Sequence, residues 1–260
     1  MQEWPNKHDS RGMNKLGLET FWLDHKNVFD GVAQKLIDEI TGNMAANFKA
    51  LEKFPEVKPD PRQQDPSGYL LRLYGNEEKW NLTTDIVFYT EEILALEELK
   101  IIYAYKNFEI SIKMLLKSSY PDTVTTNLYQ WKNLIQFFNA KGVDITQFDH
   151  FVPLNELRIV NNYCKHATEL AGEIKSIPEF RNQSLVSHIL LHRFYERVKP
   201  AIPLFIQELI DAIYKDLYEY DQPRLDKMVE GIVATMEKVT ALPYAALIKQ
   251  QYEDAPEKQI

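Results

Sequence analysis

A long stretch of the chain, residues 85–119, contains neither proline nor glycine, and this feature constrains the fold most strongly. Thr83 and Thr84 precede the stretch with hydroxyl groups that can cap a helix N-terminus, and Pro121 follows it. Within the stretch, apolar side chains recur largely every three or four residues, at Ile86, Ile93, Leu96, Leu99, Tyr103, Phe108, Ile112 and Leu115. This spacing predicts one long helix over 85–119.

Helical spacing of apolar residues also covers most of the remaining chain. It predicts further helices over 18–54, 124–140, 153–172, 184–199, 202–220, 225–240 and 244–252. Joints between them are marked by Pro200, Pro203, Pro223 and Pro243. Sustained alternation of apolar and polar residues between hairpin turns does not occur. We therefore predict an all-α fold, an irregular multi-helix bundle in which 85–119 and 124–140 form an antiparallel core.

The domain organisation follows from where this periodicity starts and stops. Residues 1–17 are polar and lack a repeating apolar period, so we expect a loosely held arm. Residues 18–82 are expected to form an N-terminal helix and a connection, because prolines interrupt 55–68 at Pro55, Pro59, Pro61 and Pro66. Residues 83–260 are expected to form one compact helical bundle.

Composition limits the possible functions more than it selects one. The chain has 9 Gly and no glycine-rich phosphate-binding pattern, and its formal net charge of -8 argues against general coating of nucleic acid. The single cysteine, Cys164, excludes an intrachain disulfide framework and favours a reducing compartment. No window approaches 18 uncharged apolar residues, and the first residues lack a basic-then-apolar signal pattern. We expect a cytoplasmic protein that does not enter a membrane.

The predicted helix that begins at Pro153 carries the most informative polar residues. On a helical wheel they fall within a sector of about 140°, and they are Arg158, Asn161, Asn162, Lys165 and His166. One interpretation is the solvated face of an ordinary amphipathic helix. The other is a site, because adjacent asparagines form helices poorly but hydrogen-bond specifically, while arginine, lysine and histidine can hold a phosphate and transfer a proton.

The residues from Leu154 to His166 read L-N-E-L-R-x-x-x-N-x-x-K-H, after a predicted long helical pair and a short turn. Over about 85–172 this arrangement resembles the HEPN proteins, small helical bundles common in prokaryotic defence and toxin–antitoxin systems. The resemblance implies a homodimer whose facing helices each supply an R-x(4–6)-H motif, often R-N-x-x-x-H, for metal-independent RNA cleavage. It assigns the family's histidine to His166 and its polar neighbour to Asn162, whereas Asn161 stands where the arginine is expected.

Two functions therefore remain open. As an endoribonuclease, the chain would use His166 as general acid or base, Asn162 to orient the substrate, and Arg158 or Lys165 to supply the charge that Asn161 cannot. No metal or cofactor is expected, and the dimer interface would include residues 154–172. As a non-catalytic interaction or regulatory module, the same face would bind a partner protein or a small anionic ligand. Asn161 favours the module, and the retained Asn-x-x-Lys-His favours the nuclease.

Other candidate groups have simpler explanations. His188, His192 and Glu196 share one side of a predicted helix and could contact a metal, but we favour boundary histidines on a mostly buried helix. Cys164 is expected to pack on the apolar side of its helix. A basic stripe on the long helix is predicted to be a solvated face rather than an RNA track, because Glu97, Glu98 and Glu109 interrupt Lys100, Lys106, Lys113 and Lys117.

Overall fold

The computed structural model confirms the all-α fold and describes residues 16–18, 20, 27–54, 77–120, 127–128, 130–167, 170 and 172–253. Within these ranges there is no β-strand. The α-helices are α2 (Val28–Leu51), α4 (Glu77–Ser119), α5 (Trp131–Ala140), α6 (Phe151–His166), α7 (His188–Val198), α8 (Ala201–Tyr218), α9 (Gln222–Thr235) and α10 (Lys238–Glu253). Two 3₁₀ turns, η3 (Ile145–Gln147) and η4 (Gly172–Ser176), flank α6.

The chain divides into two compact units, residues 1–212 and 213–260. This boundary lies within α8, whereas the sequence placed a division between 82 and 83. The difference has a physical cause at each place. Helix α2 packs along α4 and therefore belongs to the first unit. Helix α9 buries none of its residues, so the second unit has little core of its own.

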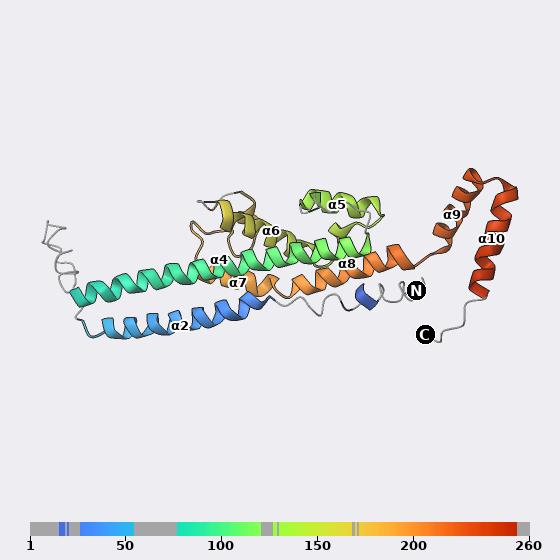
Figure 1. The fold of residues 1–260 in the computed structure, drawn as a ribbon. Coiled ribbons are helices and arrows are strands. Elements are labelled where there is room, and N and C mark those ends of the chain that lie inside the picture. The colour runs from blue at the N-terminus through green and yellow to red at the C-terminus, as the bar shows by residue number, and fades with distance from the viewer. Residues whose placement is uncertain are drawn as a thin grey trace, which may run out of the picture. The chain divides into compact units, whose positions relative to one another are not determined.

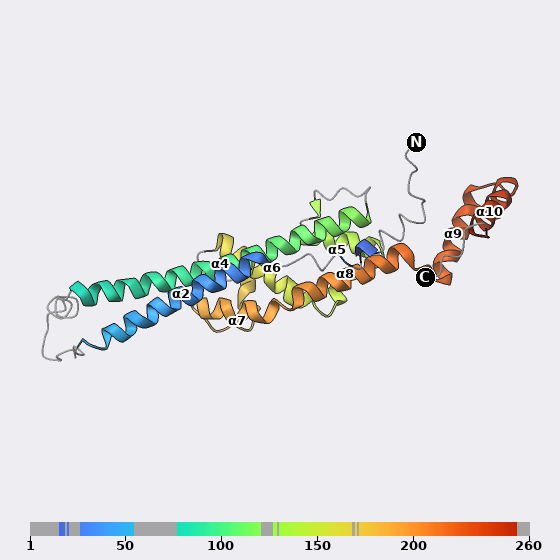
Figure 2. The ribbon, with the colours of Figure 1, turned by 60° about the horizontal axis from the view of Figure 1, so that its bottom comes forward.

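Helix α4 organises the first unit, and α2 lies antiparallel beside it (Figure 1, Figure 2). Helices α6 and α7 also pack against α4. Past the N-terminal end of α2, aromatic rings fill the interior along α4. The Phe108 ring centroid lies 6.2 Å from that of Trp131 and 5.8 Å from that of Phe205. These contacts bring α5 and α8 onto the C-terminal half of α4. The result is a helical core in which α4 contacts elements from both earlier and later in the chain.

Several helix ends differ from the predicted ones. Helix α4 begins at Glu77, so Thr83 lies inside it, and the Thr83 hydroxyl donates 2.8 Å to the Lys79 carbonyl rather than capping the helix. Helix α6 ends at His166 rather than Gly172, because Ala167 adopts an extended conformation. Gly172 has φ +70°, which favours glycine, and opens η4 instead. The predicted arm and the Pro-rich connection lie largely outside the described residues.

The second unit contains α9 and α10, which contact each other and are joined through Met236 and Glu237. Asp221 caps α9, because its side chain accepts a hydrogen bond from the Arg224 amide. Pro243 lies inside α10, although the sequence predicted a joint there. Taking the described residues together, no helix has the length and apolar character needed to cross a membrane.

Candidate functional site

Helix α6 positions the residues that the sequence singled out, and one of them lies elsewhere than predicted. Asn161 is only 1% exposed and does not belong to an exposed polar face. The reason is its register: Asn161 follows Leu157 by four residues and Val160 by one, and both of these side chains are fully buried. The Asn161 amide donates 3.3 Å to the Asn162 side-chain oxygen, while its own buried Oδ1 has no hydrogen-bond partner within the described residues.

Arg158 is already engaged by neighbouring side chains. Its Nε donates 3.1 Å to the Asn155 side-chain oxygen, and its guanidinium lies 3.7 Å from the Glu173 carboxylate, which η4 supplies. Asn155 occupies one N–H donor of Arg158, and Glu173 offsets part of the positive charge that Arg158 can offer to a ligand. Within the described part of the chain, Arg158 forms no hydrogen bond or ion pair with Lys165 or His166.

The three remaining predicted residues, Asn162, Lys165 and His166, are exposed in the last turns of α6. The structure therefore brings Asn161 and Asn162 together, leaves Asn162, Lys165 and His166 accessible, and holds Arg158 in a separate contact. The five residues do not converge into one cleft.

Cys164 and Tyr105 lie on the buried side of this region. Burial, assisted by the negative charge of Glu98, raises the pKa of the Cys164 thiol to about 12. The thiol is therefore protonated at neutral pH, as expected for a packing residue rather than a nucleophile. Burial also raises the pKa of Tyr105, and Glu109 acts in the same direction while Arg158 opposes it. Neither group is prepared to act as a base.

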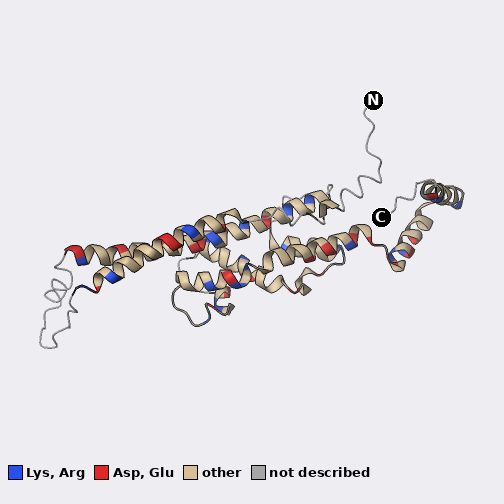
Figure 3. Cartoon of the chain, turned by 90° about the horizontal axis from the view of Figure 1, so that it is seen from below, with Lys and Arg blue, Asp and Glu red and all other residues tan. Residues whose placement is uncertain are grey.

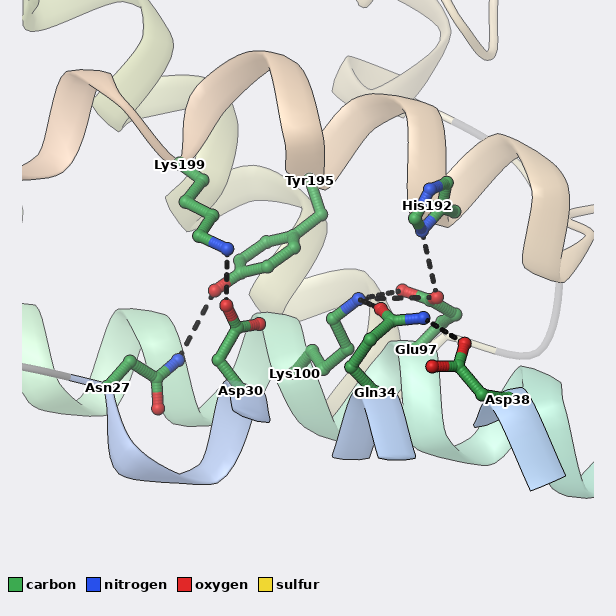
Figure 4. A network of polar contacts seen from close by, with 9 residues as sticks. All are labelled: Asn27, Asp30, Gln34, Asp38, Glu97, Lys100, His192, Tyr195 and Lys199. Atoms are coloured by element: carbon green, nitrogen blue, oxygen red, sulfur yellow. Dashed lines mark hydrogen bonds and ion pairs between the residues drawn. The ribbon is translucent and has the colours of Figure 1, made fainter. Parts of the chain in front are cut away.

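A second polar cluster, which the sequence did not predict, joins α2, α4 and α7 (Figure 4). At its centre Lys100 and Glu97 form an ion pair, with 3.1 Å between Lys100 Nζ and Glu97 Oε2. Their side chains are 1% and 2% exposed, respectively. Lys100 Nζ also donates 3.3 Å to the Gln34 side-chain oxygen of α2. From α7, His192 Nδ1 lies 3.0 Å from Glu97 Oε1. We call these four residues, with their neighbours described next, the junction network.

The network continues along α2 and α7, as Figure 4 shows. Lys199 pairs with Asp30, and this hydrogen bond raises the pKa of Lys199. Asn27 donates 3.2 Å to the Tyr195 hydroxyl. The Tyr195 ring in turn lies 5.1 Å from Lys100 Nζ, within reach of a cation–π interaction. Together these contacts tie α2, α4 and α7, with the residues that cap α2 and α7, to one another.

One sequence interpretation needs correction here, and it concerns the charged residues of α4. Lys100 and Glu97 are buried, so this part of α4 is not the solvated face that was predicted. The reason is that α2 and α7 both cover it. His192 has a carboxylate partner in Glu97, and within the described residues no group of three or more His, Cys, Asp or Glu side chains is placed to hold a metal ion.

The junction network has a structural role rather than a catalytic one. An acidic, a basic and an imidazole group stand together, but Glu97 and Lys100 are enclosed by three helices and contact one another instead of an open surface. A buried ion pair adds little net stability relative to apolar residues, yet removing one partner costs about 3–5 kcal/mol. The network therefore fixes how α2 and α7 align on α4.

A signal for the network was present in the sequence. Buried residues of α4 follow one another at three- and four-residue steps, and two of these positions hold the charged residues: the series is Ile93, Glu97, Lys100, Ala104, Phe108 and Ser111. A charge inside such a stripe indicates a buried partner, but the identity of that partner depends on distant segments.

Comparison of the chain with family models, curated proteins and solved structures found no match.

Proposed function

We propose that this chain is a non-catalytic helical interaction module, and that it binds its partner through α9 and α10. The observation that carries the proposal is the apolar surface of this hairpin. Ten large apolar side chains are between 37% and 73% exposed: Leu225, Met228, Val229, Val233, Met236, Val239, Leu242, Tyr244, Leu247 and Ile248. Large apolar side chains exposed together on one short hairpin are typical of an interaction surface.

The spacing along α9 supports a binding face rather than scattered exposure. Its apolar residues recur at three- and four-residue steps and occupy one side of the helix: Leu225, Met228, Val229, Ile232 and Val233. Lys227 lies about 160° away from Val229 on the same helix. An amphipathic helix normally buries such a stripe, and α9 buries no residue. A partner would complete the core that the hairpin lacks.

The size of the second unit points in the same direction. A hairpin of 14 and 16 helical residues is too short to bury a sufficient core alone. Asp221 caps α9 and α10 runs through Pro243, and the apolar residues of both helices remain for tertiary contacts. We place this module in the cytoplasm, because the single cysteine favours a reducing compartment.

Photo-crosslinking in cells tests the proposal directly. A photoreactive phenylalanine at Val229 should form a covalent adduct with a protein, because this position lies on the apolar side of α9. The same residue at Lys227, on the opposite side, is the matched control. Absence of an adduct from Val229, or equal adducts from both positions, would contradict the proposal.

Endoribonuclease activity of the HEPN type is the second candidate, and the exposure of Asn162, Lys165 and His166 favours it. These side chains are accessible to an RNA phosphate in the last turns of α6. We propose His166 as general acid or base, with Asn162 orienting the substrate and Lys165 or Arg158 supplying the positive charge on the phosphate. The active form would be a homodimer whose interface includes residues 154–172. Asn161 would then have a supporting role, because it is buried behind Asn162.

Cleavage of single-stranded and structured RNA in chelator distinguishes this candidate from the module. If His166 transfers a proton, His166→Ala should lower the rate by roughly 10²–10⁴ and leave the helical circular dichroism unchanged. Replacement of Lys175, an exposed residue on η4, by alanine is the control. Equal cleavage by His166→Ala, or none by the unaltered chain, would remove the nuclease candidate.

A further inference from the structure

We infer that the partner of the α9–α10 hairpin is the same hairpin of a second copy of this chain, and that the two form a four-helix bundle. This inference rests on the proposed function, because it names the occupant of the same surface.

The exposed apolar area matches what a small dimer interface requires. Complete burial of one large apolar side chain removes roughly 100 Å² from water. Ten side chains that are about half exposed therefore offer on the order of 500 Å² on each copy. Two copies together would bury about 1,000 Å², which is the lower limit for a specific interface. A second hairpin of the same size is thus sufficient to cover the surface.

The charges beside the apolar surface favour an identical copy over a strongly charged partner. On α9, Asp226, Lys227 and Glu230 alternate in sign, and on α10 Lys249 lies 3.5 Å from Glu253. Figure 3 shows both acidic and basic residues on α9. Two such surfaces repel each other little, since neither carries a block of one sign. An anionic lipid surface or RNA would instead require a predominantly basic face.

The Arg224 side chain, at the start of the hairpin, already has partners in the turn that precedes α9. The Arg224 guanidinium donates 2.9 Å to the Glu219 carbonyl, and its centre lies 4.2 Å from the Tyr220 ring centroid. Arg224 therefore closes the turn between α8 and α9. This removes an arginine that a phosphate-bearing ligand could have used, and it leaves apolar contact as the dominant chemistry of the face.

The shape of the unit fits a symmetric pair. Helices α9 and α10 have 14 and 16 residues, and because an α-helix rises about 1.5 Å per residue they are similar in length. They are joined by a connection as short as Met236–Glu237. Two helical hairpins with such short connections can pack around a twofold axis as a four-helix bundle, in which each copy presents the same surface to the other.

Sedimentation equilibrium of the purified full chain at micromolar concentration tests the inference. The expected mass is twice the 30.5 kDa of one chain. Val229→Asp should reduce the mass to that of a single chain, because it places an unpaired carboxylate in the shared core. Lys227→Glu makes a larger change in charge on the opposite side of α9 and should leave the dimer intact.

Hydrogen exchange keeps the inference testable if Val229→Asp loses its helical structure. Amides of 222–253 in the unaltered chain should become at least 10-fold more protected between dilute and micromolar protein, while those of α4 should not change. A strict monomer with concentration-independent exchange would overturn the second-copy inference. If Val229 then crosslinks in cells to a different protein, the interaction module stands with another partner; if it crosslinks to nothing, both proposals fail.

Discussion

Helices α4 and α9 use the same three- and four-residue spacing with opposite results. On α4 the stripe includes Glu97 and Lys100, and both are buried. On α9 the stripe is apolar throughout, and Val229 and Val233 are 58% and 70% exposed. The difference lies in their neighbours: α4 contacts α2, α6 and α7, whereas α9 contacts α10. Burial in this protein is decided by how many helices meet, not by the polarity of the residues that meet.

This comparison also separates two kinds of dependence. In the first unit, polar groups that cannot reach water must satisfy one another, so the junction network makes α2 and α7 necessary to α4. In the second unit, apolar groups of α9 that reach no core remain exposed to water. The first unit therefore depends on its own internal contacts, and we propose that the second depends on association.

The largest effect is expected from removing one member of the central ion pair. Lys100→Ala leaves the Glu97 carboxylate buried without its ammonium partner, so the free energy of unfolding should fall by about 3–5 kcal/mol. Urea denaturation of the first-unit transition measures this change. Lys117→Ala, at an exposed position on the same helix, should change stability by less than about 0.5 kcal/mol.

The double variant Glu97→Leu with Lys100→Met then sharpens the result. Because it removes both charges together, it should recover most of the loss caused by Lys100→Ala. If the double variant is as unstable as the single one, the network does more than pair two charges. If Lys100→Ala lowers the free energy of unfolding no more than Lys117→Ala does, Lys100 and Glu97 do not form a buried ion pair.

A leucine from each unit provides the next comparison. Leu157 is fully buried, and Leu157→Ala should destabilise the first unit by about 2–5 kcal/mol at any protein concentration. Leu225 is 41% exposed, and Leu225→Ala should cost below about 1 kcal/mol in dilute protein. At concentrations where the chain associates, the Leu225→Ala cost should grow. Thermal unfolding at two concentrations distinguishes these cases, and a constant small Leu225→Ala effect would argue against an interface.

The smallest effect concerns acid stability of the first unit. Arg197 holds two carboxylates, with 2.6 Å between its Nε and Glu179 Oε1 and 2.8 Å between its Nη1 and Glu156 Oε2. The hydrogen bonds from Arg197 lower the pKa of Glu179. A carboxyl with a lower pKa in the folded chain stabilises the fold above its unfolded pKa of about 4.3, and this contribution disappears as the pH falls through the folded pKa.

Glu179→Gln should therefore lower stability near neutral pH by about 1 kcal/mol or less, since the pair is partly exposed to solvent. The difference from the unaltered chain should begin to shrink as the pH falls through the unfolded pKa of about 4.3, and it should vanish below the lower folded pKa, where Glu179 is protonated in both states. Urea denaturation at several pH values measures it. A difference that stays constant down to low pH would mean that packing, rather than charge, is responsible.

The helices themselves were largely predictable, because their signals are local. Periodic apolar residues located the body of every described α-helix, and α7 begins one residue after its capping Ser187. Ends were less predictable where backbone conformation intervened, as at Ala167 and Gly172. The polar character of Asn162, Lys165 and His166 was also readable, and these residues are exposed.

What only the tertiary structure decided was which polar residues are buried and which apolar residues are not. Lys100 is buried because Gln34 and His192, far from it in sequence, converge on its helix with Glu97. Asn161 is buried because the side of α6 that carries Leu157 packs inward. Periodicity identifies a face, but it does not determine which helices will cover that face. That choice depends on contacts between distant segments, which is why α4 encloses charges while α9 exposes a hydrophobic stripe.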